Sequence, residues 1–387
     1  MEKKKIERNI FMLGLVSLFT DISSQMIYPL LPIFLSSVLG ASTSFIGLIE
    51  GIAESTASFV RVFSGWFSDK LKKRKPIVFW GYTLSTIGKP FLYLATAPWH
   101  VLAVRFIDRV GKGVRTPPRD ALIADSSRKE EIGRAFGFQR AMDRMGAFLG
   151  PLAAFMLLPV LNNDMRLVFL LAFIPGVLAV LIIVFYIKEK AQKEDSPVRT
   201  VSVSLRYFGR DFKMFVVILG IFTLGNSSEA FLILRAKDLG VTTVMIPVIW
   251  LMYNFVSSIV ATPLGGLSDR IGRRKTTILG FLVFSFVYFG FAFSDRQSLI
   301  WFFMAVYGIY FGLSEGVLRA YVTDLVEDKS RLATAYGVFN TVIGLCMFPA
   351  SFFMGILWQY FGAPLAFSFG AVLSLISAIA LILLIKK

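Results

Sequence analysis

Long apolar runs recur from one end of the chain to the other, and short polar segments separate them. A run of about 20 apolar residues is long enough to cross a bilayer as a helix. The pattern therefore predicts an all-α polytopic membrane protein with twelve transmembrane helices. The predicted spans lie near residues 9–38, 44–67, 76–96, 99–123, 134–160, 166–187, 213–235, 243–265, 276–294, 299–322, 333–357 and 365–385.

The ends of these runs indicate how the chain is organised. The first run follows a basic start, as in a secretion signal, but it is longer than a signal core and lacks a small-residue cleavage site. We therefore expect an uncleaved first span. The polar segment 188–212 predicts a cytoplasmic linker between two six-helix bundles, at 1–187 and 213–387.

Composition and charge agree with a membrane location. The chain is 56% hydrophobic and 17% charged, with a formal net charge of +16. With residues at the span edges counted in the adjoining segments, placing the N-terminus on the cytoplasmic side assigns 27 of the 41 Lys and Arg residues to cytoplasmic segments and 4 to outside loops. Cytoplasmic loops accumulate such residues. We therefore expect a multi-pass protein of the cell (inner) membrane with both termini cytoplasmic, in contact with lipid and not with nucleic acid.

The two sets of six spans resemble each other. Matching residues recur in the same order in both sets, 200 positions apart in most matches and 204 apart in one, which indicates an internal duplication. The matches are GWFSDKLKKRK at 65–75 with GGLSDRIGRRK at 265–275, DISSQ at 21–25 with GNSSE at 225–229, Arg119 with Arg319, and Gly137 with Gly337.

The repeated loop motif, Gly-x-x-x-Asp-[Arg/Lys]-x-x-[basic]-[Arg], gives the chain its resemblance to the major facilitator superfamily. The first copy has Lys72 where Gly is commoner, whereas Gly272 in the second copy conforms. The resemblance implies two pseudo-symmetric six-helix bundles that work by alternating access, with a cytoplasmic gate of charged residues. The gating residues that it implies are Gly65, Asp69, Arg74, Gly265, Asp269, Arg270 and Arg274. Arg115 and Arg119 are added to them because they approach the expected cytoplasmic end of the fourth span.

Two further segments narrow this resemblance. DISSQMIYPLLP and DRVGKGVRTPPRDALIAD look like a prokaryotic, drug/proton antiporter-like subgroup whose substrates are unknown. That subgroup has Glu where this chain has Gln25, so a proton-carrying role does not transfer to this position. GAFLGPLAA at 146–154 is similar to a motif of proton antiporters, with Gly146, Gly150 and Pro151 as its matching residues. Close helix packing explains the two glycines equally well.

The fourth span carries five basic and two acidic residues within RFIDRVGKGVRTPPRD at 105–120. On a helix that advances about 100° per residue, all seven fall within an arc of about 140°. Each charge at mid-bilayer costs about 2.5–3.5 kcal/mol, so we expect this stripe to face water or charges of other spans. The other charges that could pair with it are Asp21, Glu50, Glu54, Arg61, Lys89, Arg140, Asp143 and Arg144.

Two uses of these charges stay open: paired structural networks, and a central cavity that binds substrate or carries protons. Arg105 matches the buried Arg of the superfamily's Arg-x-x-x-Gly-x-Gly motif, although Arg109 occupies the first Gly position. The expected coupling residues are Asp21, Asp108, Arg105 and Glu229. The expected substrate-binding residues are Arg109, Lys112, Glu50, Glu54, Gln25, Arg140, Asp143, Asn254 and Asn340.

The resulting hypothesis is proton-coupled export of a small organic molecule or drug by a monomeric secondary transporter. Uptake or exchange of an anion is the main alternative, and a facilitator-fold sensor or scaffold is another. The chain has no nucleotide-binding loop and no grouped nucleophile, base and orienting residue, so an enzyme is not expected. With one His and one Cys, no metal site is expected, and a proton gradient takes the place of a cofactor.

Overall fold

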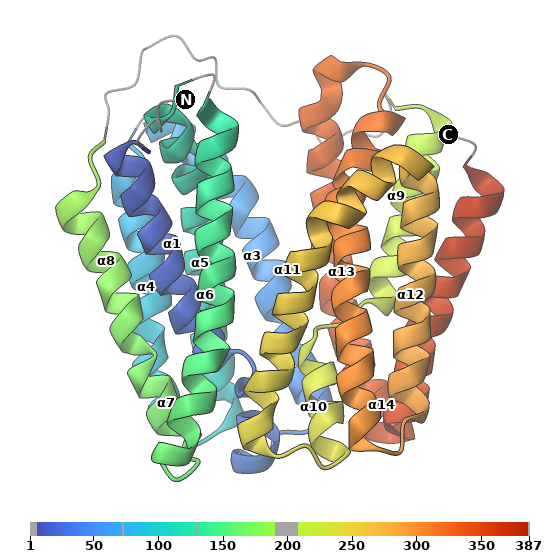
Figure 1. Ribbon diagram of the computed structural model, residues 1–387, viewed down its shortest axis with the longest axis horizontal. Helices are drawn as coiled ribbons and strands as arrows, with labels where there is room; N and C mark the ends of the chain where they lie inside the picture. Colours follow the sequence, from blue (N-terminus) through green and yellow to red (C-terminus); the bar gives the residue numbers. More distant parts are fainter. Residues whose placement is uncertain (1–5, 72, 129–130, 190–207, 386–387) are drawn as a thin grey trace. The chain divides into compact units, whose positions relative to one another are not determined.

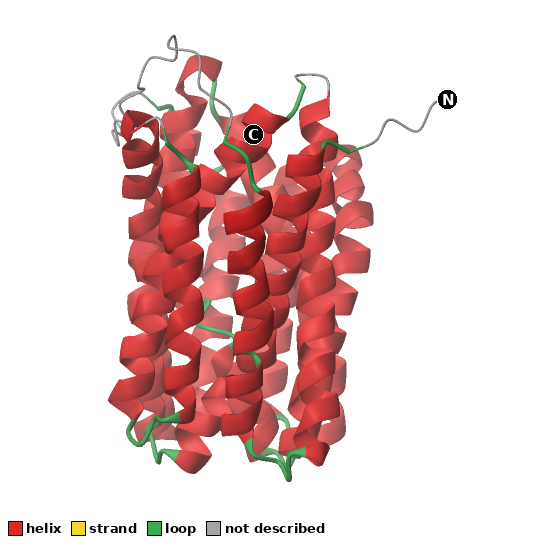
Figure 2. Ribbon diagram, turned by 90° about the vertical axis from the view of Figure 1, so that its left-hand side faces the viewer, coloured by secondary structure: helices red, strands yellow, loops and turns green. Residues whose placement is uncertain are grey.

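The computed structural model describes residues 6–71, 73–128, 131–189 and 208–385. Within these residues the chain forms helices joined by short loops, and no strand occurs (Figure 2). Contacts along the chain divide it into two compact units. The first comprises Met1–Phe34 with Thr56–Thr200, and the second comprises Leu35–Ser55 with Val201–Lys387.

The first unit holds most of the first six predicted spans (Figure 1). Its helices are α1 (Arg8–Ile27), α2 (Leu31–Ile33), α4 (Lys75–Tyr93), α5 (Pro98–Ser126), α6 (Ile132–Val160), α7 (Met165–Leu171) and α8 (Phe173–Tyr186). The π-helical turn η1 (Phe34–Val38) follows α2. Helix α3 (Thr43–Leu71) begins in the second unit and ends in the first.

The second unit holds the remaining spans. Its helices are α9 (Arg210–Gly225), α10 (Ala230–Asp238), η4 (Thr243–Met245), α11 (Ile246–Ile271), α12 (Arg273–Phe293), α13 (Gln297–Leu325), η5 (Lys329–Arg331) and α14 (Leu332–Leu384). Gly362 interrupts α14 with a φ of 83°, so this element contains the last two predicted spans.

Eight elements in the described part of the chain are long and apolar enough to cross a membrane. One of them is the interrupted α14, which accounts for two predicted spans. Helices α3, α4 and α5 supply the other three, and they are more polar because the charges of the second to fourth spans lie on them. The segment predicted as a linker lies mostly outside the described residues, as does Lys72.

The same helix pairs pack together in both units. In the first, α1 packs on α6 and α4 on α5, and in the second, α9 packs on α14 and α12 on α13. A glycine on the fourth span of each set also meets a valine two spans earlier. A Cβ at Gly113 would lie 2.7 Å from Cβ of Val60, and one at Gly312 would lie 2.8 Å from Cγ2 of Val260. The duplication read from the sequence is therefore also present in the packing.

The first and seventh spans are broken helices, which the apolar runs did not predict. In the first span, α1 ends at Ile27 and a turn precedes Leu31, where Pro29 and Pro32 remove backbone donors. In the seventh, α9 ends at Gly225 and α10 begins at Ala230. Non-helical backbone at membrane depth needs partners within the protein. At the first break the N–H groups of Tyr28 and Leu30 donate to backbone oxygens, and at the second the N–H of Ser228 donates to Oγ of Ser351.

Candidate functional site

Helix α5 buries its basic stripe inside the first unit. The side chains of Arg105, Arg109 and Arg115 are 6–7% exposed, whereas Phe106 and Ile107 on the other side are 41–46% exposed. Lys112 lies on the charged side of α5 but is exposed. The stripe therefore has a buried part, which other helices neutralise and bond, and an accessible part at Lys112.

Lys89 on α4 connects α4 to the first span. Its Nζ donates to Oγ of Ser23 at 2.5 Å and to Oγ of Ser24 at 3.3 Å, and the Ser23 hydroxyl donates to the backbone oxygen of Ala172. The lysine is 5% exposed. Asp21 and Asp108 both lie within its electrostatic reach. Sequence reasoning noted Lys89 only as one further charge, because nothing in the third span's pattern points to the serines of the first.

Asp21 lies where α1, α5 and α6 meet. Its carboxylate is within electrostatic reach of Lys112, Arg115 and Arg119 on α5 and of Asp143 on α6. Two carboxylates and three bases thus act on one another across three helices. Such a group can change its protonation when its charged neighbours move.

Glycines of α6 determine how closely Asp21 approaches this helix. A Cβ at Gly146 would lie 2.7 Å from Cβ of Asp21, and one at Gly150 would lie 2.7 Å from Cβ of Gln25. Pro151 follows inside α6. The antiporter-like motif therefore forms a close contact between α1 and α6 that sets the positions of Asp21 and Gln25.

Arg115 is bonded between α4 and α5. Its Nη1 donates to Oγ of Ser85, whose hydroxyl donates to the backbone oxygen of Asp108 at 3.0 Å. The guanidinium lies 4.5 Å from the ring centroid of Tyr82. Arg105 makes a similar contact with the ring of Tyr28, at 5.6 Å. Cation–π contacts of this kind help to hold a desolvated guanidinium.

The C-terminal third of the stripe bonds to Ser17 of α1, which also accepts a hydrogen bond from Gln139 of α6. Arg119 donates to Oδ1 of its neighbour Asp120 at 2.8 Å and to Oγ of Ser17 at 3.5 Å. Gln139 donates to the same serine oxygen at 3.2 Å and to Oδ2 of Asp143 at 2.5 Å. Gln139 was not singled out from the sequence, although it is buried and joins α6 to Ser17 of α1.

The two copies of the loop motif have corresponding ion pairs. In the first copy Arg74 pairs with Asp125, at the end of α5, and in the second Arg273 pairs with Asp324, near the end of α13, at 2.5 Å. Arg273 also pairs with Asp269 at 3.2 Å. The side chain of the predicted gating residue Asp69 lies outside the described residues.

Both copies of the loop motif also make hydrogen bonds that involve backbone groups. The backbone N–H groups of Arg74 and Lys75 donate to Oε1 of Glu189, which satisfies the open N-terminus of α4. In the second copy Arg274 donates to the backbone oxygens of Leu381 and Ile382. Of the other predicted gating residues, Gly65 lies in α3, and Gly265 and Arg270 lie in α11.

In the second unit, the predicted residues Glu50 and Glu229 lie at the break in the seventh span. Glu50 accepts a hydrogen bond from Ser228 at 3.2 Å. Glu229, at the start of α10, is within electrostatic reach of the hydroxyls of Tyr288, Tyr307 and Tyr310.

The other predicted substrate-binding residues are more dispersed. The amide of Asn254 donates to the Trp250 oxygen of its own helix at 2.9 Å, and the side chains of Asn340 and Arg140 are exposed. Glu54 lies one turn after Glu50 on α3. The predicted coupling residues are therefore divided, with Asp21, Arg105 and Asp108 in the first unit and Glu229 in the second.

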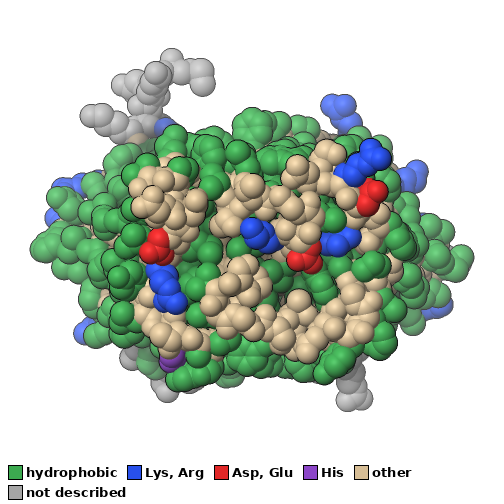
Figure 3. Space-filling view, turned by 90° about the horizontal axis from the view of Figure 1, so that it is seen from below, with side chains coloured by type: hydrophobic (Ala, Val, Ile, Leu, Met, Phe, Trp, Pro, Cys, Tyr) green, Lys and Arg blue, Asp and Glu red, His purple; other side chains and the backbone are tan. Residues whose placement is uncertain are grey.

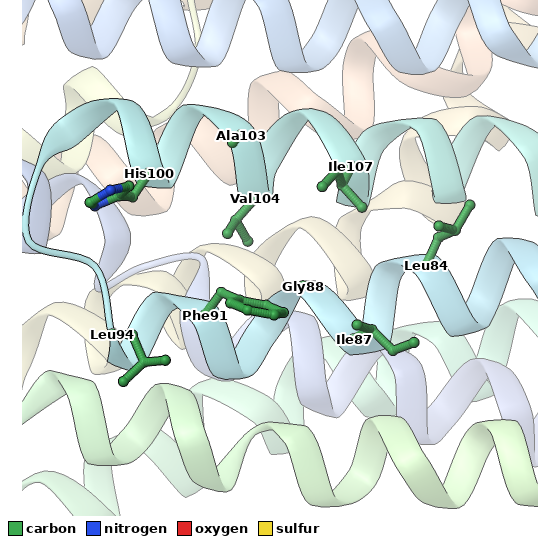
Figure 4. A pocket seen from close by; sticks show the side chains of 9 residues that line it. All are labelled: Leu84, Ile87, Gly88, Phe91, Leu94, His100, Ala103, Val104 and Ile107. Atoms are coloured by element: carbon green, nitrogen blue, oxygen red, sulfur yellow. The ribbon is translucent and has the colours of Figure 1, made fainter.

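A separate pocket of about 490 Å³ lies between α4 and α5, on the face of α5 away from the charged stripe (Figure 4). Leu84, Ile87, Gly88, Phe91, Leu94, His100, Ala103, Val104 and Ile107 line it. Ile87, Phe91 and Leu94 are 53–64% exposed. This apolar pocket does not include any of the charged candidates, so it is not the site of their chemistry.

Comparisons with known proteins place these observations in a family. Residues 13–351 and 212–387 match the profile described as Major Facilitator Superfamily. An uncharacterised MFS-type transporter of Methanocaldococcus jannaschii is 36% identical over 385 residues, covering 98% of this chain and 95% of that protein. The multidrug resistance protein MdtH of Photorhabdus laumondii is 29% identical over 126 residues, covering 33% and 31%. The nucleoside transporter NupG has a similar fold, with a TM-score of 0.82 at 13% identity over 97% of this chain and 100% of that one.

Proposed function

The chain belongs to the Major Facilitator Superfamily of membrane transporters, and on this premise we propose that it exports a small organic molecule or drug in exchange for protons. The observation that carries the proposal is the group formed by the buried Lys89 with the partly buried Asp21 and Asp108 inside the first unit. Ionisable residues at membrane depth are expensive and commonly mark proton or substrate pathways. The partial similarity to MdtH, a multidrug resistance protein, supports an organic substrate.

In this proposal Asp21 carries the proton. It is held against α6 by the contact with Gly146 and lies within reach of Lys112, Arg115 and Arg119. Alternating access moves helices relative to one another, so the charges around Asp21 differ between the two states. A change in those charges alters the proton affinity of the carboxylate, which links proton binding to the conformational step.

Substrate contacts are assigned to the accessible part of the stripe. Lys112 on α5 and Arg140 on α6 are exposed, whereas Arg105 and Arg109 on α5 are buried. The ion pairs of Arg74 with Asp125 and of Arg273 with Asp324 would fasten helix ends at the cytoplasmic gate.

We place both termini on the cytoplasmic side of the cell membrane. The loops at the opposite ends of the helices, such as 94–97 and 239–242, are short, and the face seen in Figure 3 carries a few charged side chains of both signs among hydrophobic and other side chains. Lys and Arg concentrate instead in the loops that we assign to the cytoplasm, such as 72–75 and 270–275. Such an asymmetry sets orientation in membranes.

Proton flux in proteoliposomes tests the proposal. Substrates found by thermal-shift screening are added outside, and lumenal pH is followed with a trapped dye. The wild-type protein should move protons when substrate is added, and Asp21→Asn should remove this flux. Asp295→Asn, in a loop where the side chain is 79% exposed, serves as the matched control. Full coupling in Asp21→Asn would exclude Asp21 as the proton carrier.

Uptake or exchange of an anion is the second candidate, and the basic surplus of α5 favours it. Five bases and two acids lie between residues 105 and 120. An anion exchanger would need no pH gradient and would lose anion binding in Arg109→Ala. Anion binding that survives this substitution, together with substrate-driven proton flux, would exclude the exchanger.

A further inference from the structure

The first half of α3 is docked on α14 within the second unit. The Thr43 hydroxyl donates to the backbone oxygen of Gly355 at 3.0 Å, and the Ser55 hydroxyl donates to that of Gly344 at 2.8 Å. These bonds lie at the two ends of the segment 43–55. The second half of α3 belongs to the other unit, so this one helix runs from one unit into the other.

Glycines bring the two helices into backbone contact between those bonds. A Cβ at Gly47 would lie 2.3 Å from the backbone oxygen of Ser351, and one at Gly51 would lie 2.8 Å from that of Phe348. Small residues permit this approach, and van der Waals contact and hydrogen bonds then hold the helices together in lipid. A contact of this kind is closely packed but has few strong bonds.

Glu50 lies within this docked segment and is bonded to the break in the seventh span. Its side chain is 2% exposed, and its Oε2 accepts from the Ser228 hydroxyl at 3.2 Å. The same Ser228 oxygen accepts from the backbone N–H of Ala230, the first residue of α10, at 3.3 Å. The backbone N–H of Ser228 donates to Oγ of Ser351 on α14 at 3.1 Å. Three elements therefore meet at Ser228.

Ionisation of Glu50 determines how strong this junction is. A carboxylate makes a charge-assisted bond to the serine hydroxyl, which is about twice as strong as a neutral one. The N-terminus of α10 also favours a negative charge close to it. Protonation removes both effects. Glu54 lies one turn after Glu50 on α3, and Glu229 follows Ser228 at the break, whereas the described length of α14 carries no Asp, Glu, Lys, Arg or His.

We propose that Glu50 is a proton-sensitive clasp that fastens the first half of α3 to the break in the seventh span. Ionised Glu50 holds Ser228 and keeps the segment 43–55 docked on α14. Protonated Glu50 weakens this bond and releases the segment. Glu50 is thus a positioning residue. Its part in transport rests on the proposed proton-coupled function, whereas the clasp itself does not depend on any substrate.

Hydrogen–deuterium exchange of the full-length protein in lipid nanodiscs tests the clasp without a substrate. Exchange of peptides from 43–55 is measured at acidic and alkaline pH and corrected for the intrinsic chemical rate. In the wild-type protein the corrected rate should be about tenfold higher at acidic pH, as the loss of a hydrogen bond to a charged group predicts. Glu50→Gln should exchange at the fast rate at both pH values, and Asp295→Asn, in a loop where the side chain is 79% exposed, should behave like the wild-type protein.

Ser228→Ala supplies a second variant that leaves the carboxylate in place. It should raise exchange of 43–55 at alkaline pH and shrink the difference between the two pH values. A pH response that persists in Glu50→Gln, or a wild-type protein with no response, would overturn the clasp. The response together with an absence of substrate-driven proton flux would support the clasp and count against the proposed function alone.

Discussion

Gly146→Ala is expected to destabilise the contact between α1 and α6. The added Cβ would lie 2.7 Å from Cβ of Asp21 and 2.7 Å from the backbone oxygen of Leu18. Neither atom is the end of a flexible side chain, so the helices must separate. Overpacking of this kind costs about 1–3 kcal/mol, and replacing glycine inside a helix regains about 0.5–1 kcal/mol. We therefore expect a net loss of about 1–2 kcal/mol in the free energy of unfolding.

Gly137→Ala on the same helix is the control. A Cβ at this position has no neighbour within 4 Å, so only the gain in helix propensity applies, about 0.5–1 kcal/mol. Thermal unfolding of both variants in one detergent should place Gly146→Ala below the wild-type protein and Gly137→Ala level with it or above. Equal stability of the two variants would refute the inference that close packing at Gly146 positions Asp21.

Three further predictions concern single contacts. Lys89→Met removes two hydrogen bonds from a charged donor, which destabilises the protein by about 1.5–3 kcal/mol for each bond. It also removes the cost of placing a charge in the membrane, which stabilises the protein by about 2.5–3.5 kcal/mol. The variant should therefore fold and lose proton-coupled flux in proteoliposomes, and an unchanged pH dependence of flux would contradict this. Asp324→Asn and Arg273→Ala should show a coupling energy below about 1 kcal/mol in a double-mutant cycle, because the pair is partly exposed. Gly362→Ala should lose about 1–3 kcal/mol on thermal unfolding, since alanine is strained at a φ of 83°.

The fold class and the family could be predicted from the sequence, and both are confirmed. Apolar runs of bilayer length are a local signal, and the repeated loop motif needs only two segments to be compared. Helix breaks were harder to foresee. Asn226 to Ser228 lie inside an apolar run and carry no proline, and their open backbone is satisfied by partners such as Ser351, 123 residues away from Ser228.

The partners of the candidate charges could not be predicted for a related reason. The helical period places Arg105, Arg109 and Arg115 on one face, and the sequence of this one span is enough to predict that. It cannot tell that Lys89 meets Ser23, 66 residues earlier, or that Arg74 meets Asp125. Such pairings depend on which helices pack together. The roles of the candidate site residues stay predictions for the experiments above.

The two halves also differ in register at the ends of their fourth spans. The aligned motif sets Arg74 opposite Arg274, 200 positions later, yet the ion pair of the second half uses Arg273. Its acidic partner has shifted by the same single residue, because Asp324 lies 199 positions after Asp125. Both ends of the bond have thus moved together. The ion pair between the two helix ends is therefore present in both halves, although aligned positions do not form it. A residue's role should be transferred between the halves from the contact that it makes, and not from its aligned position.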